Sequence, residues 1–155
     1  MTLADFIAPE AVLPSLSAEN KKQLLAALSG HAAELCGLQE RDIFDVLLQR
    51  ERLGSTGLGQ GVAIPHGKIS GLNRMVGLFA RLAEPIDFDA IDAEPVSIVV
   101  LLLAPEGAGA DHLKALARKS RLLRDRQSLR KLKSTGDAEA LYAVLTQDEA
   151  ASHAA

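Results

Sequence analysis

Tryptophan is absent from the 155 residues, and aromatic residues together make up only 3% of the chain. Proteins that bind single-stranded nucleic acid stack bases on aromatic side chains, so this composition argues against that class. Cys36 is the single cysteine, which excludes an internal disulfide framework and a cysteine-based zinc cluster. Long apolar runs are missing as well, because the longest one, residues 98–104, is far too short to cross a bilayer.

Neither sign of charge dominates. The chain carries 17 basic and 20 acidic residues, for a formal net charge of −3 at pH 7, which does not favour nucleic acid or a membrane surface as a partner. The N-terminal stretch MTLADFIAPEAVLPSL lacks the basic and apolar regions of a secretory signal. With 48% hydrophobic and 24% charged residues, the composition is that of an ordered globular protein. We therefore expect one cytoplasmic domain over residues 1–148, a flexible tail over 149–155 and no insertion into a membrane.

The first part of the chain has the apolar periodicity of two helices. Ser17 is the candidate N-cap of the first helix, and Gly37 is the residue at which it is expected to stop. The second helix is expected over about 39–53. The next eight residues, GSTGLGQG, hold four glycines, so we expect irregular backbone there.

Three β-like runs follow, over residues 61–65, 75–83 and 96–104. The last run is almost wholly apolar, is rich in Val and Ile and is bounded by prolines, which predicts a central strand buried on both faces. Helical patterns return after it, first from Asp111 as a cap and then near 127–132 and 137–146. The sequence therefore predicts a single α/β layered domain, in which helices flank both faces of a mixed, mostly five-stranded sheet.

One histidine has an unusual setting. Pro65 fixes the backbone before His66 and Gly67 leaves no side chain beside the imidazole, so we expect an exposed ring on a rigid ledge. Neutral imidazole is nucleophilic without a strong base. The upstream glycines and the hydroxyls of Ser55 and Thr56 can direct N–H and O–H donors toward an anion. An ordinary surface histidine is the simpler interpretation, which this combination of neighbours disfavours.

The segment GSTGLGQGVAIPHGK resembles the phosphorylation-site signature of IIA domains of the fructose–mannitol class, in the bacterial phosphoenolpyruvate-dependent phosphotransferase system. The strings LLQRE before it and PIDFDAIDAEPV, LLLAP and DHL after it extend the resemblance over most of the chain. The stand-alone nitrogen-regulatory enzyme IIA is the most similar branch.

This resemblance implies an α/β fold with a mixed sheet and a phosphoryl group carried transiently on His66, as a tele-phosphohistidine. The implied donor is the phosphohistidine of a small HPr-like carrier protein, and the implied targets are regulatory proteins. No cofactor and no metal are expected. The activity would be one step of a phosphotransferase relay, without a free small-molecule substrate.

Two further residues are candidates for supporting roles. Arg50 shares the apolar face of its helix, and an inward-pointing arginine needs a phosphoryl or acidic partner, so charge balance and an ordinary salt bridge are both open. His112 is expected in the first turn of the helix that Asp111 caps, where backbone N–H groups favour an anion, so it is a candidate supporting donor or a plain surface residue. The candidate phosphoryl-binding loop comprises Ser55, Thr56, Gly57, Gly59 and Gly61. Its two hydroxyls could equally bond their own backbone.

Other functions stay open from the sequence. One is a sugar-transport IIA that passes its phosphoryl group to a IIB domain, although no IIB-like segment is fused to this chain. Another is an interaction module of the same fold that is never phosphorylated. A metal-dependent hydrolase using two histidines lacks a clear third ligand. The basic segment 118–133 carries a net charge of +7, but no DNA-recognition motif accompanies it, and it could instead steer a protein partner.

Overall fold

The most apolar segment of the chain forms the centre of the sheet. In the computed structural model, which describes residues 3–107 and 121–154, β6 (Val96–Pro105) pairs antiparallel with β5 (Val76–Ile86) along one edge. Its other edge pairs in parallel with two short segments, β3 (Val62–Ala63) and then β4 (His66–Ile69). The prediction of a central strand between two prolines is confirmed.

Two outer strands complete the sheet. β1 (Ile7–Leu16) lies parallel to β5, and β2 (Gly57–Gly59) lies antiparallel to β3, which gives six strands in the described part of the chain. A one-turn 3-10 helix, η1 (Leu3–Phe6), precedes β1. β1 was not among the expected strands, and it contains Pro9 and Pro14, which are uncommon within strands. The strand forms nonetheless, since it pairs only with β5 and an edge strand tolerates residues without an N–H.

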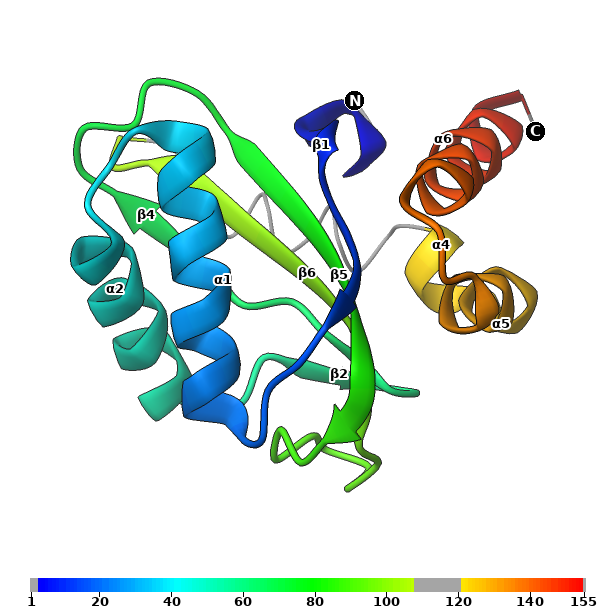
Figure 1. Cartoon of the computed structure of the whole chain (residues 1–155), viewed down its shortest axis with the longest axis horizontal. Helices are drawn as coiled ribbons and strands as arrows, with labels where there is room; N and C mark the ends of the chain where they lie inside the picture. Colours follow the sequence, from blue (N-terminus) through cyan, green and yellow to red (C-terminus); the bar gives the residue numbers. More distant parts are fainter. Residues whose placement is uncertain (1–2, 108–120, 155) are drawn as a thin grey trace.

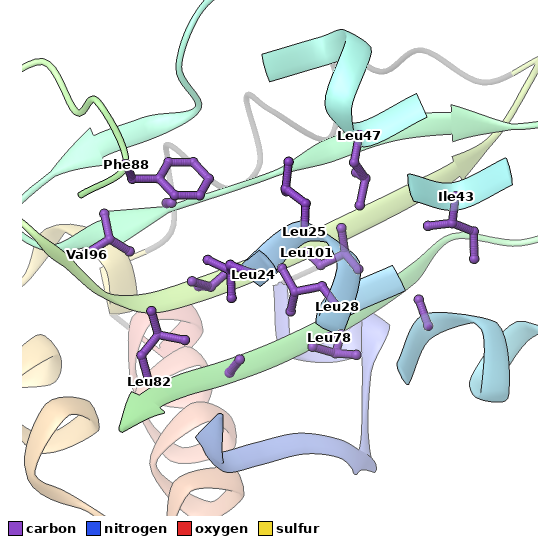
Figure 2. Packing of buried hydrophobic residues seen from close by; sticks show 14 of the residues in the cluster. Leu24, Leu25, Leu28, Ile43, Leu47, Leu78, Leu82, Phe88, Val96 and Leu101 are labelled. Carbon is purple, nitrogen blue, oxygen red and sulfur yellow. The ribbon is translucent and has the colours of Figure 1, made fainter. Parts of the chain in front are cut away.

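The side chains of β6 alternate between two cores, one on each face of the sheet. On one face Val99, Leu101 and Leu103 pack with α1 (Lys21–Cys36) and α2 (Glu40–Arg52). Figure 2 shows the leucines of α1 packed between α2 and the strands of this face.

The opposite face of the sheet is covered by the C-terminal helices. Here Ile98, Val100 and Leu102 form a core with apolar residues of α4 (Arg121–Arg124), α5 (Arg126–Ser134) and α6 (Ala138–Ala154). Figure 1 shows the two groups of helices on either side of the sheet. The predicted α/β layered architecture with both faces covered is therefore confirmed.

The structure corrects two local expectations. Asn20, not Ser17, is the N-cap of α1, because its Oδ1 accepts a hydrogen bond from the Gln23 N–H at 2.9 Å. The glycine-rich stretch was expected to be irregular, yet residues 57–59 form β2, because Gly57 and Gly59 align with β3. The helix expected from Asp111 begins outside the described residues.

At the C-terminus, α6 extends to Ala154, into the segment for which a flexible tail was expected. No helix in the described ranges is long and apolar enough to cross a membrane.

Two glycines of the first helical hairpin should respond to alanine with opposite signs. Gly37 ends α1 in the left-handed region at φ 72°, so Gly37→Ala should lower the free energy of unfolding by about 1 kcal/mol. Gly30 lies inside α1, and an added Cβ would meet only the flexible carboxylate of Glu40, at 3.3 Å. Gly30→Ala should raise the free energy of unfolding by about 0.5 kcal/mol. Urea denaturation of both variants checks this, and a Gly37→Ala variant as stable as the wild type would contradict the role given to the left-handed conformation at Gly37.

Candidate functional site

The candidate nucleophile lies where a strand is interrupted. β3 ends at Ala63 and β4 begins at His66, and both run along the same edge of β6. Between them Pro65 has no N–H to donate, but its carbonyl accepts the Leu102 N–H at 3.0 Å, so the chain stays against β6 through the break. His66 is therefore the first residue of a strand segment paired with the centre of the sheet.

The imidazole of His66 is held by both ring nitrogens. Nδ1 lies 2.9 Å from the carbonyl oxygen of Ile64, and because a carbonyl can only accept, Nδ1 carries a proton. The Nε–H of Arg50 donates a hydrogen bond to Nε2 of His66 at 3.3 Å. Nε2 can accept this bond only if it carries no proton. Both contacts fit the neutral imidazole, with the lone pair of Nε2 directed toward the guanidinium.

The expectation of an exposed ring is wrong, because His66 is only 5% exposed. Pro65 and Gly67 do leave room beside the imidazole, but other parts of the fold fill it. β6 lies along one side of the strand and α2 packs over β4, so that the ring meets the backbone of Ile64 and the side chain of Arg50.

Arg50 is where the sequence placed it, half-buried near the C-terminal end of α2. Its Nη1 donates to the carbonyl oxygen of Gly54 at 2.9 Å while its Nε contacts His66. The salt bridges found in the described residues do not include Arg50. The guanidinium is thus fixed at two points, one of which is the unprotonated Nε2 of His66.

A surface pocket beside His66 has three cationic side chains in its lining. The pocket measures about 680 Å³, and Arg50, Arg52 and Lys68 contribute to its lining. Leu53, at its rim, is 86% exposed, which is unusual for a leucine. This combination of positive charge with an exposed apolar side chain suits an anionic group and a protein surface that carries it.

Gly67 is required for α2 to lie this close to β4. A Cβ on Gly67 would lie 2.5 Å from Cγ1 of Val46, a stiff β-branched side chain one helical turn before Arg50. Gly67→Ala should therefore lower the free energy of unfolding by about 1 to 2 kcal/mol. Adding Val46→Ala should recover most of that loss, because it removes the methyl group in the way. Urea titrations of the single and double variants test this coupling, and additive losses would contradict it.

The loop hydroxyls are engaged within the protein. Ser55 Oγ donates to the Phe88 carbonyl oxygen at 2.6 Å and accepts from the Gly57 N–H at 3.1 Å. Thr56 Oγ1 donates to the carboxylate of Glu51. Both hydroxyls thus hold the loop in place, and a direct role in binding a phosphoryl group stays a prediction.

The three loop glycines pack against two other segments. A Cβ on Gly57 would meet Ala90 at 2.9 Å, one on Gly59 would meet Asp92 at 3.1 Å, and one on Gly61 would meet Lys133 at 2.9 Å. Gly59 and Gly61 also have positive φ values of 94° and 80°. Close packing and turn geometry therefore account for glycine at all three positions.

The carboxylate of Asp92 stabilises the turn at Gln60 through hydrogen bonds. Asp92 accepts from the N–H groups of Gln60 at 2.9 Å and of Glu94 at 3.1 Å, and these hydrogen bonds hold the pKa of the Asp92 carboxyl below its usual range. A carboxyl with a lowered pKa stabilises the fold above its unfolded pKa, and this contribution is lost as the pH falls through the folded value.

Sequence reasoning missed Glu51. It lies on the stripe formed by Ile43 and Leu47 at steps of four along α2, and that spacing was the available signal for a buried position. Its carboxylate accepts from the Thr56 N–H at 3.1 Å and pairs with Lys21 Nζ at 3.1 Å.

His112, the other candidate histidine, lies outside the described residues, so its supporting role stays a prediction. Within the ranges 3–107 and 121–154, no three His, Cys, Asp or Glu side chains are grouped so that they could hold a metal ion.

Comparison with known proteins gives the family. Residues 5–148 match the family described as "Phosphoenolpyruvate-dependent sugar phosphotransferase system, EIIA 2". A nitrogen regulatory protein of Bradyrhizobium diazoefficiens is 59% identical over 145 residues, which cover 94% of this chain and 95% of that protein. The nitrogen regulatory protein of Escherichia coli K12 is 36% identical over 150 residues, or 96% of this chain and 92% of that one.

Solved structures agree with this assignment. The crystal structure of nitrogen regulatory protein IIA-Ntr from Neisseria meningitidis superposes with a TM-score of 0.83 at 35% identity, covering 92% of this chain and 98% of that one. The sequence match, the named relatives and the shared fold concur over nearly the whole length. The chain therefore belongs to the EIIA 2 family of the phosphoenolpyruvate-dependent sugar phosphotransferase system.

Proposed function

We propose that this protein is a phosphocarrier and regulator in which Nε2 of His66 accepts a phosphoryl group from the phosphohistidine of an HPr-like protein. The observation that carries the proposal is the state of the imidazole. Nδ1 is held as a donor by the Ile64 carbonyl, so the lone pair for a new bond is on Nε2, where Arg50 and the cationic pocket lie. This geometry supports a tele-phosphohistidine.

The transfer step follows from this arrangement. The Nε2 lone pair forms a bond to phosphorus while the P–N bond of the donor phosphohistidine breaks, and that electron pair returns to the donor nitrogen. Nδ1 keeps its proton and its bond to Ile64 throughout, so the ring need not turn. Arg50 Nε–H, which bonds Nε2 before the reaction, is placed to bond a phosphoryl oxygen afterwards. The protein supplies position and charge, which is most of what phosphoryl transfer requires.

Phosphorylation would then change what the protein binds. It adds about one net negative charge while Nδ1 keeps its proton, and about two once that proton is lost, to a pocket lined by three cations and an exposed leucine. A partner that docks on the unmodified cationic surface would be disfavoured by the phosphoryl group, and one that carries its own cations would be favoured. The nitrogen regulatory proteins among the relatives support a regulatory target over onward transfer to a IIB domain.

Intact-mass spectrometry after incubation with phosphoenolpyruvate and the relay proteins tests the proposal. We expect the mass to rise by one phosphoryl group, and the adduct to be lost in acid and to persist in base, as phosphohistidine requires. A protein that stays unmodified with an active relay would instead be an interaction module of this fold. Onward transfer to an isolated IIB domain would identify the sugar-transport function.

A further inference from the structure

A buried carboxylate lies behind the proposed phosphoryl site. The side chain of Glu51 is 3% exposed and is surrounded by donors. Thr56 gives it a backbone N–H at 3.1 Å and its hydroxyl, and Lys21 Nζ lies 3.1 Å away. A buried carboxylate is stable only with such partners, so Glu51, Thr56 and Lys21 form one unit.

From this unit a series of hydrogen bonds leads to His66. The carbonyl of Thr56, held by Glu51 through its N–H and hydroxyl, accepts the Ile64 N–H at 3.0 Å. The carbonyl of Ile64 accepts the Nδ1–H of His66 at 2.9 Å. The position of the acceptor that selects the Nδ1–H tautomer therefore depends on where Glu51 holds Thr56.

A second route from Glu51 leads to the other ring nitrogen. The backbone carbonyl of Glu51 accepts the Gly54 N–H at 3.1 Å, and the Gly54 carbonyl accepts Arg50 Nη1 at 2.9 Å. Arg50 in turn meets Nε2 of His66 through Nε. This second route runs through the backbone of Glu51, so only the route through Thr56 depends on the Glu51 carboxylate.

We propose that Glu51 is a positioning residue for phosphoryl transfer: by fixing Thr56, it holds His66 in the Nδ1–H tautomer, in which Nε2 is unprotonated and faces Arg50. The inference rests on the proposed function for its consequence on transfer, but not for its consequence on the ring. Lys21 is the counter-ion that allows the carboxylate to be buried, and its Nζ also lies 4.5 Å from the centre of the Phe88 ring.

The state of the ring is measured directly by nitrogen NMR of the imidazole, at a pH where it is neutral. In the unmodified protein we expect a protonated Nδ1 and an unprotonated Nε2. Glu51→Ala leaves the Thr56 N–H without its acceptor and removes one of the two carboxylates that Lys21 pairs with, so the loop should shift and the spectrum should report a mixture of both tautomers. Glu51→Gln keeps an oxygen for the Thr56 N–H and should retain most of the Nδ1–H form.

The rate of phosphoryl uptake from the HPr-like donor is the second measurement. Glu51→Ala should slow it by about tenfold or more, because small displacements of a nucleophile strongly reduce transfer. Thr56→Val, which removes the hydroxyl but keeps the N–H, should slow it less. Ile43→Val is the matched control, because it removes a buried methyl group from the same stripe of α2 without touching the hydrogen bonds, and it should keep the wild-type rate and spectrum.

The outcomes separate the two proposals. An unphosphorylated wild-type protein would contradict the proposed function, while the spectra would still decide whether Glu51 positions the ring. An unchanged tautomer in Glu51→Ala would overturn the inference, whether or not transfer slows. If Glu51→Ala does not fold, Thr56→Val decides, because it removes the hydroxyl through which Glu51 also holds Thr56, and a wild-type spectrum together with a wild-type rate in this variant would overturn the inference.

Discussion

Replacing His66 with alanine is expected to abolish phosphoryl uptake from the HPr-like donor while leaving the protein folded. The surrounding contacts hold the imidazole with Nδ1 protonated and Nε2 unprotonated and facing Arg50, which is the form that can act as a nucleophile. The fold should survive, since the two cores are built from aliphatic side chains on both faces of the sheet and do not depend on the ring. Intact-mass spectrometry after incubation with the relay would show no adduct.

Ser55 provides the control for this experiment. Its hydroxyl donates to the Phe88 carbonyl, so Ser55→Ala should still accept a phosphoryl group, with a loss of stability of about 1 kcal/mol. Any residual adduct on His66→Ala that resists acid would place the phosphoryl group on a hydroxyl and contradict the assignment. His66→Gln, which keeps a polar side chain of similar size, should also fail to react, because an amide nitrogen is not nucleophilic.

Much of the fold could be predicted because local pattern and burial agree. The run 96–104 is apolar at every position but one, and it became the strand with helices on both faces. Gly37 was expected to end the first helix and does so with a positive φ. The sequence did not predict β1, where local pattern and tertiary pairing disagree. Its prolines favour a loop, and the strand forms because it pairs with β5.

The sequence identified residues of the candidate site, but it did not predict which groups surround them. The neighbours of His66, the helix face of Arg50 and the family resemblance singled out these two residues, and the structure brings them into contact. Exposure of His66 was misjudged because its neighbours in sequence are small, whereas the groups that cover it come from α2 and β6. Glu51 was missed because its partners Lys21 and Thr56 lie thirty and five residues away in opposite directions along the chain, and only the fold joins them.

The tautomer is the part of the site that no sequence pattern could supply. It depends on the Arg50 Nε–H at Nε2 and on the carbonyl of Ile64, which is turned toward Nδ1 because Pro65 interrupts the strand and Thr56 holds the Ile64 N–H. Backbone groups carry no residue-specific signal, so their direction follows only from the complete hydrogen-bond pattern. The chemistry of the side chain is thus set in part by backbone geometry two residues away.

Arg50→Ala is expected to slow phosphoryl uptake by about a hundredfold, which corresponds to about 2.7 kcal/mol of transition-state stabilisation. The guanidinium bonds Nε2 before transfer and is placed to compensate the charge that arrives with the phosphoryl group. Arg50→Lys should recover only part of the rate, because an ammonium cannot bond the Gly54 carbonyl and the reacting group in the same planar arrangement. The phosphorylated form of Arg50→Ala should also hydrolyse faster. Quenched-flow measurement of adduct formation gives the rates.

Arg41→Ala separates a local effect from a change in net charge. Arg41 is exposed in the first turn of α2, at the other end of the helix from Arg50. Arg41→Ala removes one positive charge, as Arg50→Ala does, but at a position away from His66, so phosphoryl uptake should stay near the wild-type rate. A structural role for Arg50 would have a different signature: the free energy of unfolding would fall while the transfer rate held. That result would leave Arg50 as an anchor for the Gly54 carbonyl, and charge balance at the phosphoryl group would have to come from the other cations of the pocket, Arg52 and Lys68.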